Sequence, residues 1–223
     1  RNIEAMHGYT PGEQPSGGSV TKLNTNENPY PPSPAVAAAL AGVDIAALRR
    51  YPPPLATDFR QAAAALHDVS VDHVIPTNGG DELLRLVLTT YVETTDTVVV
   101  AEPSYSLYPV LTDIQGCHLE RVPLTADWQL PADFSARLQD AKLCILVNPH
   151  APSGQLLSVE TLGELAGSFE GLLLVDEAYV DFVDPEQDYD SLPLVREPAN
   201  VLLLRTMSKG YSLAGLRFGY GLG

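Results

Sequence analysis

One stretch near the end of the chain decides the fold: residues 201–217 read VLLLRTMSKGYSLAGLR. The apolar run at 201–204 is typical of a buried strand, and Lys209 follows it among small residues. A lysine that a strand end delivers into a cleft loses water, so that its pKa falls and it becomes a nucleophile toward aldehydes. The stretch therefore predicts a strand whose end carries a reactive lysine.

A second apolar run ends in a carboxylate followed by a phenol. Residues 172–179 read LLLVDEAY, which places Asp176 at the predicted strand end and Tyr179 three residues later. A pyridoxal phosphate (PLP) site requires a lysine for the covalent link and a carboxylate that keeps the pyridine nitrogen protonated. Lys209 and Asp176 are therefore the predicted catalytic pair.

With these two segments the chain resembles fold-type I PLP-dependent aminotransferases, and most closely the histidinol-phosphate aminotransferases. The resemblance covers nearly the whole chain. It implies an N-terminal arm at 1–30 and a PLP-binding large domain at 31–223, incomplete at its carboxy-terminal end. The implied fold is a three-layer α/β/α arrangement around a mostly parallel sheet, with the small C-terminal domain absent from this sequence. It also implies that Tyr179 contacts the phenolate oxygen of the cofactor.

The alternation of apolar runs and helical patterns independently indicates a mostly parallel sheet with helical crossovers. Because the apolar strands are nearly continuous, we expect helices on both faces of the sheet. Ser33 is expected to cap an alanine-rich helix that ends at Leu40. Strands are expected at 74–76, 97–100, 119–122, 143–147, 172–175, 201–204 and 217–221, and further helices at 59–66, 83–92, 107–114, 134–138 and 162–166.

A glycine pair, Gly79 and Gly80, follows the first of these strands and opens a helix. Backbone amides at a helix start bind anions, and glycines let the backbone approach a phosphate closely. The resemblance assigns the cofactor phosphate to this loop. Asp81 is expected to cap the helix and to contribute mainly its backbone amide. By the same resemblance, Ser208 and Arg217 are the remaining phosphate ligands.

Aromatic residues and an arm asparagine complete the implied site. Tyr105 matches the residue that stacks on the pyridine ring, whereas Tyr108 is expected to serve in packing. Tyr51 matches a tyrosine that reaches the cofactor phosphate of the neighbouring subunit, which implies a homodimer. In the arm, Tyr9 and Asn26 match substrate-binding positions, with Tyr9 at the substrate phosphate.

Residues 148–154, NPHAPSG, depart from the family pattern. Ala151 stands where an asparagine normally donates a hydrogen bond to the phenolate oxygen of the cofactor. Loss of that donor is expected to raise the pKa of the imine that the lysine forms. Tyr179 alone, His150 or a water molecule remain open as the group that contacts this oxygen.

Composition limits the partners and the compartment. The 13 Lys and Arg against 28 Asp and Glu give a net charge of −15, which argues against nucleic acid and anionic membranes as partners. No apolar run approaches the roughly 18 to 20 residues of a membrane span, and the first residues lack a signal-peptide pattern, so we expect a cytoplasmic protein. Cys117 and Cys144 are expected to be buried or half-buried thiols, and the histidine spacings predict no metal site.

The sequence therefore predicts PLP-dependent transamination of a small molecule. The resemblance implies histidinol phosphate with 2-oxoglutarate and glutamate, a step of histidine biosynthesis. Threonine-phosphate decarboxylase and aromatic aminotransferase share the lysine and the aspartate, and they remain alternatives. An alternative of another class is a catalytically inactive PLP-fold segment that acts as a binding module, which Ala151 and the early end of the sequence favour.

Overall fold

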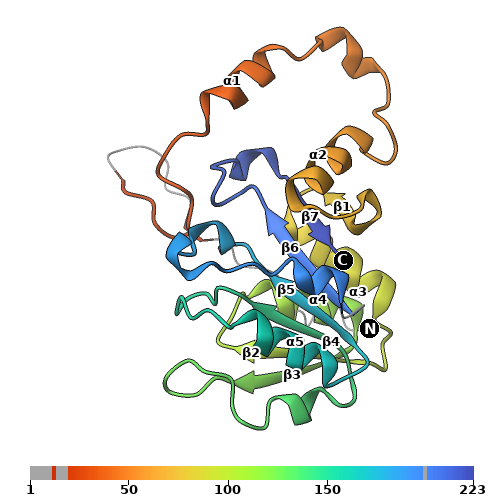
Figure 1. Ribbon diagram of the computed structural model, residues 1–223, viewed down its shortest axis with the longest axis vertical. Helices are drawn as coiled ribbons and strands as arrows, with labels where there is room; N and C mark the ends of the chain where they lie inside the picture. Colours follow the sequence, from red (N-terminus) through yellow and green to blue (C-terminus); the bar gives the residue numbers. More distant parts are fainter. Residues whose placement is uncertain (1–11, 14–19, 198–199) are drawn as a thin grey trace.

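The computed structural model describes residues 12–13, 20–197 and 200–223, and its centre is a sheet in the order β1-β7-β6-β5-β4-β2-β3 (Figure 1). Neighbouring strands from β3 to β6 pair in parallel, while β7 is antiparallel to both of its neighbours. The predicted mostly parallel sheet is thereby confirmed. The strands are β1 (Val74–Thr77), β2 (Thr97–Glu102), β3 (His118–Pro123), β4 (Ala141–Val147), β5 (Leu172–Asp176), β6 (Val201–Thr206) and β7 (Gly219–Leu222).

Helices connect most of the strands. Those of α type in the described residues are α1 (Pro34–Ala41), α2 (Thr57–His67), α3 (Gly80–Tyr91), α4 (Leu107–Gln115), α5 (Val159–Gly167) and α6 (Pro193–Arg196). The side chain of Ser33 accepts a hydrogen bond from the amide of Ala35, which confirms the predicted cap of α1. Each helix in these parts of the chain is too short or too polar to cross a membrane.

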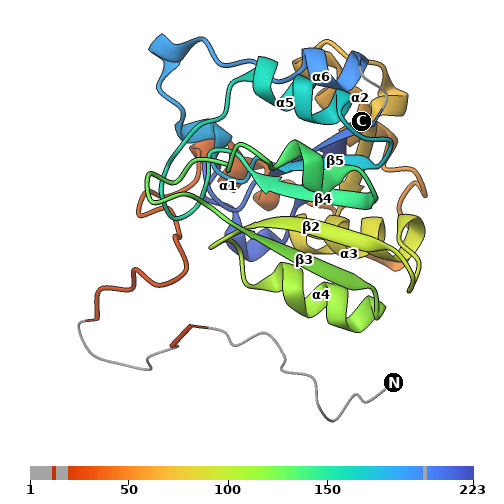
Figure 2. The same ribbon diagram turned by 90° about the horizontal axis from the view of Figure 1, so that it is seen from below.

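Apolar clusters on both faces of the sheet make the fold three layers thick (Figure 2). Helices α3 and α4 cover one face, and α2, α5 and α6 cover the other. Along β2, Val98 and Val100 enter the first cluster, whereas Val99 and Ala101 enter the second, because successive strand side chains point to opposite faces. This double cover is the reason for the continuous apolar runs in the sequence.

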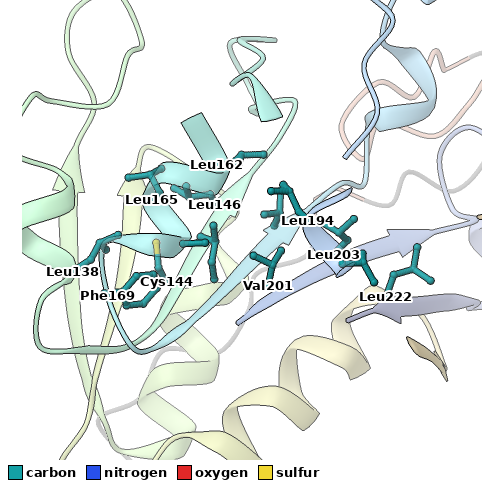
Figure 3. Close-up of a cluster of buried hydrophobic side chains, with 14 of the residues drawn as sticks. Leu138, Cys144, Leu146, Leu162, Leu165, Phe169, Leu194, Val201, Leu203 and Leu222 are labelled. Carbon is teal, nitrogen blue, oxygen red and sulfur yellow. The ribbon is translucent and has the colours of Figure 1, made fainter. Parts of the chain in front are cut away.

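Figure 3 shows the cluster on the α5 and α6 face, where side chains from helices and strands interdigitate. Leu162 of α5, Leu203 of β6 and Leu222 of β7 are fully buried in it. Full burial of a side chain of this size contributes roughly 1.5 to 3 kcal/mol. Packing on both faces therefore fixes β6, the strand that leads into Lys209.

Local details differ from the sequence-based expectations. The helix expected at 134–138 is a 3₁₀ helix at Ser135–Leu138. The strand expected at 217–221 begins at Gly219, because Arg217 has a φ of +52° and so interrupts the extended backbone. The prediction that Asp81 caps its helix is wrong, since Gly79 is the N-cap residue of α3.

The carboxyl ends of β1, β4, β5 and β6 open on the same edge of the sheet. β4, β5 and β6 are mutually parallel, and β1 runs in their direction because both β1 and β6 are antiparallel to β7. The loop at Gly79, the segment 148–154, Asp176 and Lys209 follow or end these strands. In open α/β sheets this edge is where ligands bind.

The segment before α2 leaves the sheet. Helix α1 and the 3₁₀ helix Ile45–Arg49 contain no buried residue, and Figure 1 shows them in a segment that arches away from the sheet, here called the α1 arch. Exposed large apolar side chains on the α1 arch are Leu40, Val43, Ile45, Leu48, Tyr51 and Leu55. An exposed apolar surface of this extent is typical of a contact with another chain or domain.

Candidate functional site

Lys209 lies on the turn after β6, at the edge where the parallel strands end. Its ammonium donates a hydrogen bond of 2.7 Å to the backbone oxygen of Thr25 and lies 5.8 Å from the centre of the Tyr179 ring. Burial lowers the pKa of Lys209, while the carboxylates of Glu27 and Asp81 act in the opposite direction. A lysine with a lowered pKa is the nucleophile that imine formation needs.

Asp176 is the last residue of β5, the strand beside β6, and it is buried. Its carboxylate accepts a hydrogen bond of 2.7 Å from the hydroxyl of Tyr108 and one of 3.1 Å from the backbone N–H of Ala178. Burial raises the pKa of Asp176, and these two donors and Lys209 act against that rise. The site therefore contains a lysine and a carboxylate at the ends of adjacent strands.

The start of α3 brings together the residues predicted to bind phosphate. Gly79 has a φ of +88°, and Gly80 is the first residue of the helix. The Arg217 guanidinium lies 3.4 Å from the hydroxyl of Ser208 and 3.5 Å from the carboxylate of Asp81. A side-chain carbon at Gly79 would approach that guanidinium to 2.6 Å, so glycine leaves the room that it occupies. Helix-start amides, a hydroxyl and a guanidinium together suit a phosphate.

Two tyrosines, one just before α4 and one in its first turn, reach toward this group. The hydroxyl of Tyr105 donates to the carboxylate of Asp81 at 3.3 Å, and its ring meets that of Tyr108 edge to face at 5.6 Å. Tyr108 is fully buried, in keeping with its predicted packing, but its hydroxyl also bonds to Asp176. Sequence reasoning missed this contact. The sequence gives no signal for it, because Tyr105 precedes α4 and the acceptor, Asp176, is brought to Tyr108 only by the tertiary packing.

The arm segment 25–28 passes over the lysine. Asn26 donates a hydrogen bond of 3.0 Å to the hydroxyl of Tyr179. Asn28 donates to the backbone oxygens of Lys209 and Gly210, at 3.2 and 3.4 Å. Of these arm residues only Asn26 was predicted to belong to the site. The contacts of Thr25 and Asn28 involve backbone oxygens, which a sequence cannot reveal as acceptors. The arm thus contributes to the site within one chain.

Other candidate residues lie apart from this group. Tyr9 falls outside the described residues. Tyr51 is fully exposed on the α1 arch. The single chain therefore brings together Lys209, Asp176, Tyr179, the phosphate-loop residues, Tyr105, Ser208, Arg217 and Asn26.

His150, next to Ala151, has both ring nitrogens engaged by neighbouring loops. Nε2 lies 2.9 Å from the backbone oxygen of Pro103, and Nδ1 lies 2.7 Å from the hydroxyl of Ser153. Because a carbonyl oxygen only accepts, Nε2 donates the hydrogen bond to Pro103. His150 therefore ties the loop of Tyr105 to the segment 148–154.

A buried polar network lies behind the strand ends. Glu177 is 1% exposed and pairs with Arg205 at 2.6 Å. The hydroxyl of Tyr189 donates a hydrogen bond of 3.3 Å to the Glu177 carboxylate. Asn148 in turn donates to Tyr189 at 2.8 Å. Burial raises the pKa of Glu177, and Arg205 acts against this rise. The network therefore gives Glu177 a structural role.

The chain matches known proteins over nearly all of its length. A family model described as "Aminotransferase class I and II" matches residues 18–223. "Histidinol-phosphate aminotransferase 1" of Trichormus variabilis is 46% identical over 224 residues, which cover 100% of this chain and 62% of that protein. "Histidinol-phosphate aminotransferase" of Rhodopirellula baltica is 44% identical over 219 residues, which cover 98% of this chain and 59% of that protein. The chain therefore spans about three fifths of the length of these relatives.

Solved structures match the fold as well. The crystal structure of histidinol-phosphate aminotransferase from Sinorhizobium meliloti in complex with pyridoxal-5'-phosphate superposes with a TM-score of 0.80. Its sequence is 29% identical, and the match covers 89% of this chain and 55% of that chain.

Proposed function

Because the chain belongs to the class I and II aminotransferase family, we propose that the protein transfers an amino group between histidinol phosphate and 2-oxoglutarate with PLP as cofactor. The observation that carries this proposal is the pairing of a half-buried lysine with a buried carboxylate at the ends of adjacent strands, beside a helix start. The relatives at 46% and 44% identity, both named histidinol-phosphate aminotransferases, support the substrate and a role in histidine biosynthesis.

The residues present fit PLP. Its phosphate suits the start of α3 together with Ser208 and Arg217, and the absence of a side chain at Gly79 leaves room for the Arg217 guanidinium beside this helix start. Its ring nitrogen suits the buried carboxylate of Asp176, and its aldehyde suits the amine of Lys209.

When bound, PLP supplies an electron sink that stabilises negative charge on the substrate α-carbon. Lys209 would hold the cofactor through its Nζ atom, and once released this amine would accept the proton from the substrate α-carbon. The lowered pKa of Lys209 favours the neutral amine that this role needs. Asp176 holds a proton on the ring nitrogen, which requires the carboxylate to be ionised.

Further residues hold and orient the cofactor. Arg217 and Ser208 bind the phosphate, and Tyr105 covers one face of the ring. Tyr179 donates to the phenolate oxygen, a position at which Ala151 offers no donor. Asn26, hydrogen-bonded to Tyr179, lies where the arm can contact substrate.

A homodimer would complete the site. We assign Tyr51 to the cofactor phosphate of the neighbouring subunit and Tyr9 to the substrate phosphate. The full exposure of Tyr51 on the apolar α1 arch supports this assignment, because such a surface gains stability by packing against a second copy. The biosynthetic relatives support a cytoplasmic enzyme with a small-molecule substrate, and the net charge of −15 argues against nucleic acid as a partner.

The test is turnover by the full-length protein. With histidinol phosphate and 2-oxoglutarate we expect glutamate to form, and we expect Lys209→Ala to reduce kcat at least about 10³-fold. Lys142→Ala, which removes a lysine that lies over the Tyr91 ring away from the site, is the matched control and should keep activity. Release of CO₂ from O-phosphothreonine would instead favour the decarboxylase. PLP binding without turnover of any amino substrate would favour the binding module.

A further inference from the structure

Tyr108 makes a short hydrogen bond to the carboxylate that the cofactor needs. The oxygen atoms of Tyr108 and Asp176 are 2.7 Å apart, a distance typical of a phenol that donates to an ionised carboxylate. Both residues are buried, so that this bond lies away from competing water. Removal of the donor would leave Asp176 with the backbone amide of Ala178 on one oxygen only.

The same phenol ring supports the residue assigned to the face of the cofactor. The rings of Tyr108 and Tyr105 meet at an interplanar angle of 90° with centres 5.6 Å apart, an arrangement that aromatic pairs favour. Tyr108 therefore contacts both the carboxylate assigned to the ring nitrogen and the aromatic assigned to the ring face.

Tyr108 is also a donor that keeps its proton. Burial, and next the charge of Asp176, raise the pKa of Tyr108 well above its ordinary value, so the hydroxyl stays protonated near neutral pH. The charged groups around Asp176 are Lys209, on the turn after β6, and Asp81 of α3, which act in opposite directions on its carboxyl. Lys209 gains and loses a proton in the proposed reaction, so its charge near Asp176 changes. The Tyr108 hydroxyl keeps its proton and therefore stabilises the ionised Asp176 carboxylate throughout.

We propose that Tyr108 is a positioning residue, which keeps Asp176 ionised and in register with Tyr105 so that Asp176 holds the proton on the cofactor's ring nitrogen. This role rests on the proposed function, and it assigns Tyr108 more than packing. Tyr108 itself contacts neither substrate nor cofactor in this assignment.

The direct test is Tyr108→Phe, which keeps the ring and removes the hydroxyl. In the cofactor-free full-length protein, the side-chain carboxyl of Asp176 is followed by ¹³C NMR against pH, with Asp176→Asn to assign the signal. We expect the midpoint to move to higher pH, because the ionised form loses a donor. Tyr220→Phe is the matched control, since it removes a buried hydroxyl that lies 2.9 Å from His67 and leaves Asp176 untouched. An unchanged midpoint in Tyr108→Phe would overturn the proposal.

The second measurement is steady-state turnover of the same variants. We expect Tyr108→Phe to lower kcat about tenfold or more, since a hydrogen bond to a charged group is lost, with KM for histidinol phosphate within about twofold. Equal kcat values in Tyr108→Phe and Tyr220→Phe would show a structural role and overturn the proposal. If the wild-type protein does not transaminate, the proposed function fails, and the Asp176 titration still decides whether Tyr108 holds that carboxylate ionised.

Discussion

At the scale of single residues, burial acts in opposite directions on the two central groups of the site. It lowers the pKa of Lys209, which favours the free amine, and raises the pKa of Asp176, which favours the neutral acid. Only the first effect helps the proposed chemistry. The donors on Asp176, the Tyr108 hydroxyl and the Ala178 amide, act against the second effect and favour the ionised carboxylate at this buried edge.

Gly79 offers a test of the phosphate site by comparison with Gly154. Both have positive φ angles, +88° and +76°, so alanine strains the backbone at either position. Only at Gly79 would the added carbon approach the Arg217 guanidinium, whereas at Gly154 it meets open space. We expect Gly79→Ala to weaken PLP binding at least about tenfold and Gly154→Ala to change it less than about twofold, in a fluorescence titration. Equal weakening in both variants would contradict the phosphate site.

The predictability of the site residues depended on what determines each of them. Lys209 and Asp176 were predictable because each follows an apolar strand, and the ends of parallel strands share one edge. Tyr108 was not, because a buried phenol bonds to whichever acceptor the tertiary packing brings to it. Asp81 was assigned to the helix cap from its position after two glycines, but Gly79 caps α3 and the carboxylate of Asp81 faces Arg217 instead.

At the scale of elements, the strands that are covered on both faces were the most predictable. β4, β5 and β6 are continuous apolar runs, since each face lies under helices. The antiparallel direction of β7 was not readable from its sequence, GYGL, because the turn before it and not the strand pattern sets the direction. The alternation of helices and strands nevertheless fixed the layer arrangement.

The attachment of α2 to the sheet is expected to depend on pH through His67. Its ring nitrogen lies 2.9 Å from the Tyr220 hydroxyl on β7, and burial, together with Arg205, lowers the pKa of His67. The unfolded chain, with a histidine pKa of about 6.5, therefore takes up a proton first as the pH falls. The stabilisation of the folded protein by neutral His67 is fully present above about pH 6.5, the pKa of histidine in the unfolded chain, and it is lost as the pH falls through the lower pKa of His67 in the folded protein.

Urea unfolding at several pH values measures this effect. We expect the free energy of unfolding to decrease between about pH 7 and about pH 5, and to decrease less in His67→Gln. His118→Gln, which replaces an exposed histidine on the edge strand β3, should keep the wild-type slope. If His67→Gln and the wild type show the same slope, the histidine does not couple α2 to pH.

At the scale of the whole molecule, the exposed α1 arch and the assignment of Tyr51 predict that each site needs two chains. In mixed dimers of Lys209→Ala and Tyr51→Ala, one site combines both defects and the other has neither. Equal mixing by co-expression should therefore restore about a quarter of the wild-type activity, because half of the dimers are mixed and one of their two sites is intact.

A matched pair of variants controls this mixing experiment. Lys209→Ala and Asp176→Ala both change residues that one chain brings together, so their mixture should restore no activity. No recovery with Tyr51→Ala would show that Tyr51 does not act across subunits, whereas recovery in the control would show that Lys209 and Asp176 of one chain do not share a site.

Mass spectrometry can locate the covalent link between the protein and the cofactor. The full-length protein is mixed with PLP, reduced with borohydride, digested and analysed by mass spectrometry, with Lys209→Ala and Lys142→Ala alongside. We expect a reducible absorption band and a cofactor adduct on the peptide that contains Lys209, absent from Lys209→Ala and kept in Lys142→Ala. An adduct on another lysine, or none in the wild-type protein, would contradict the assignment of this strand edge as a PLP site.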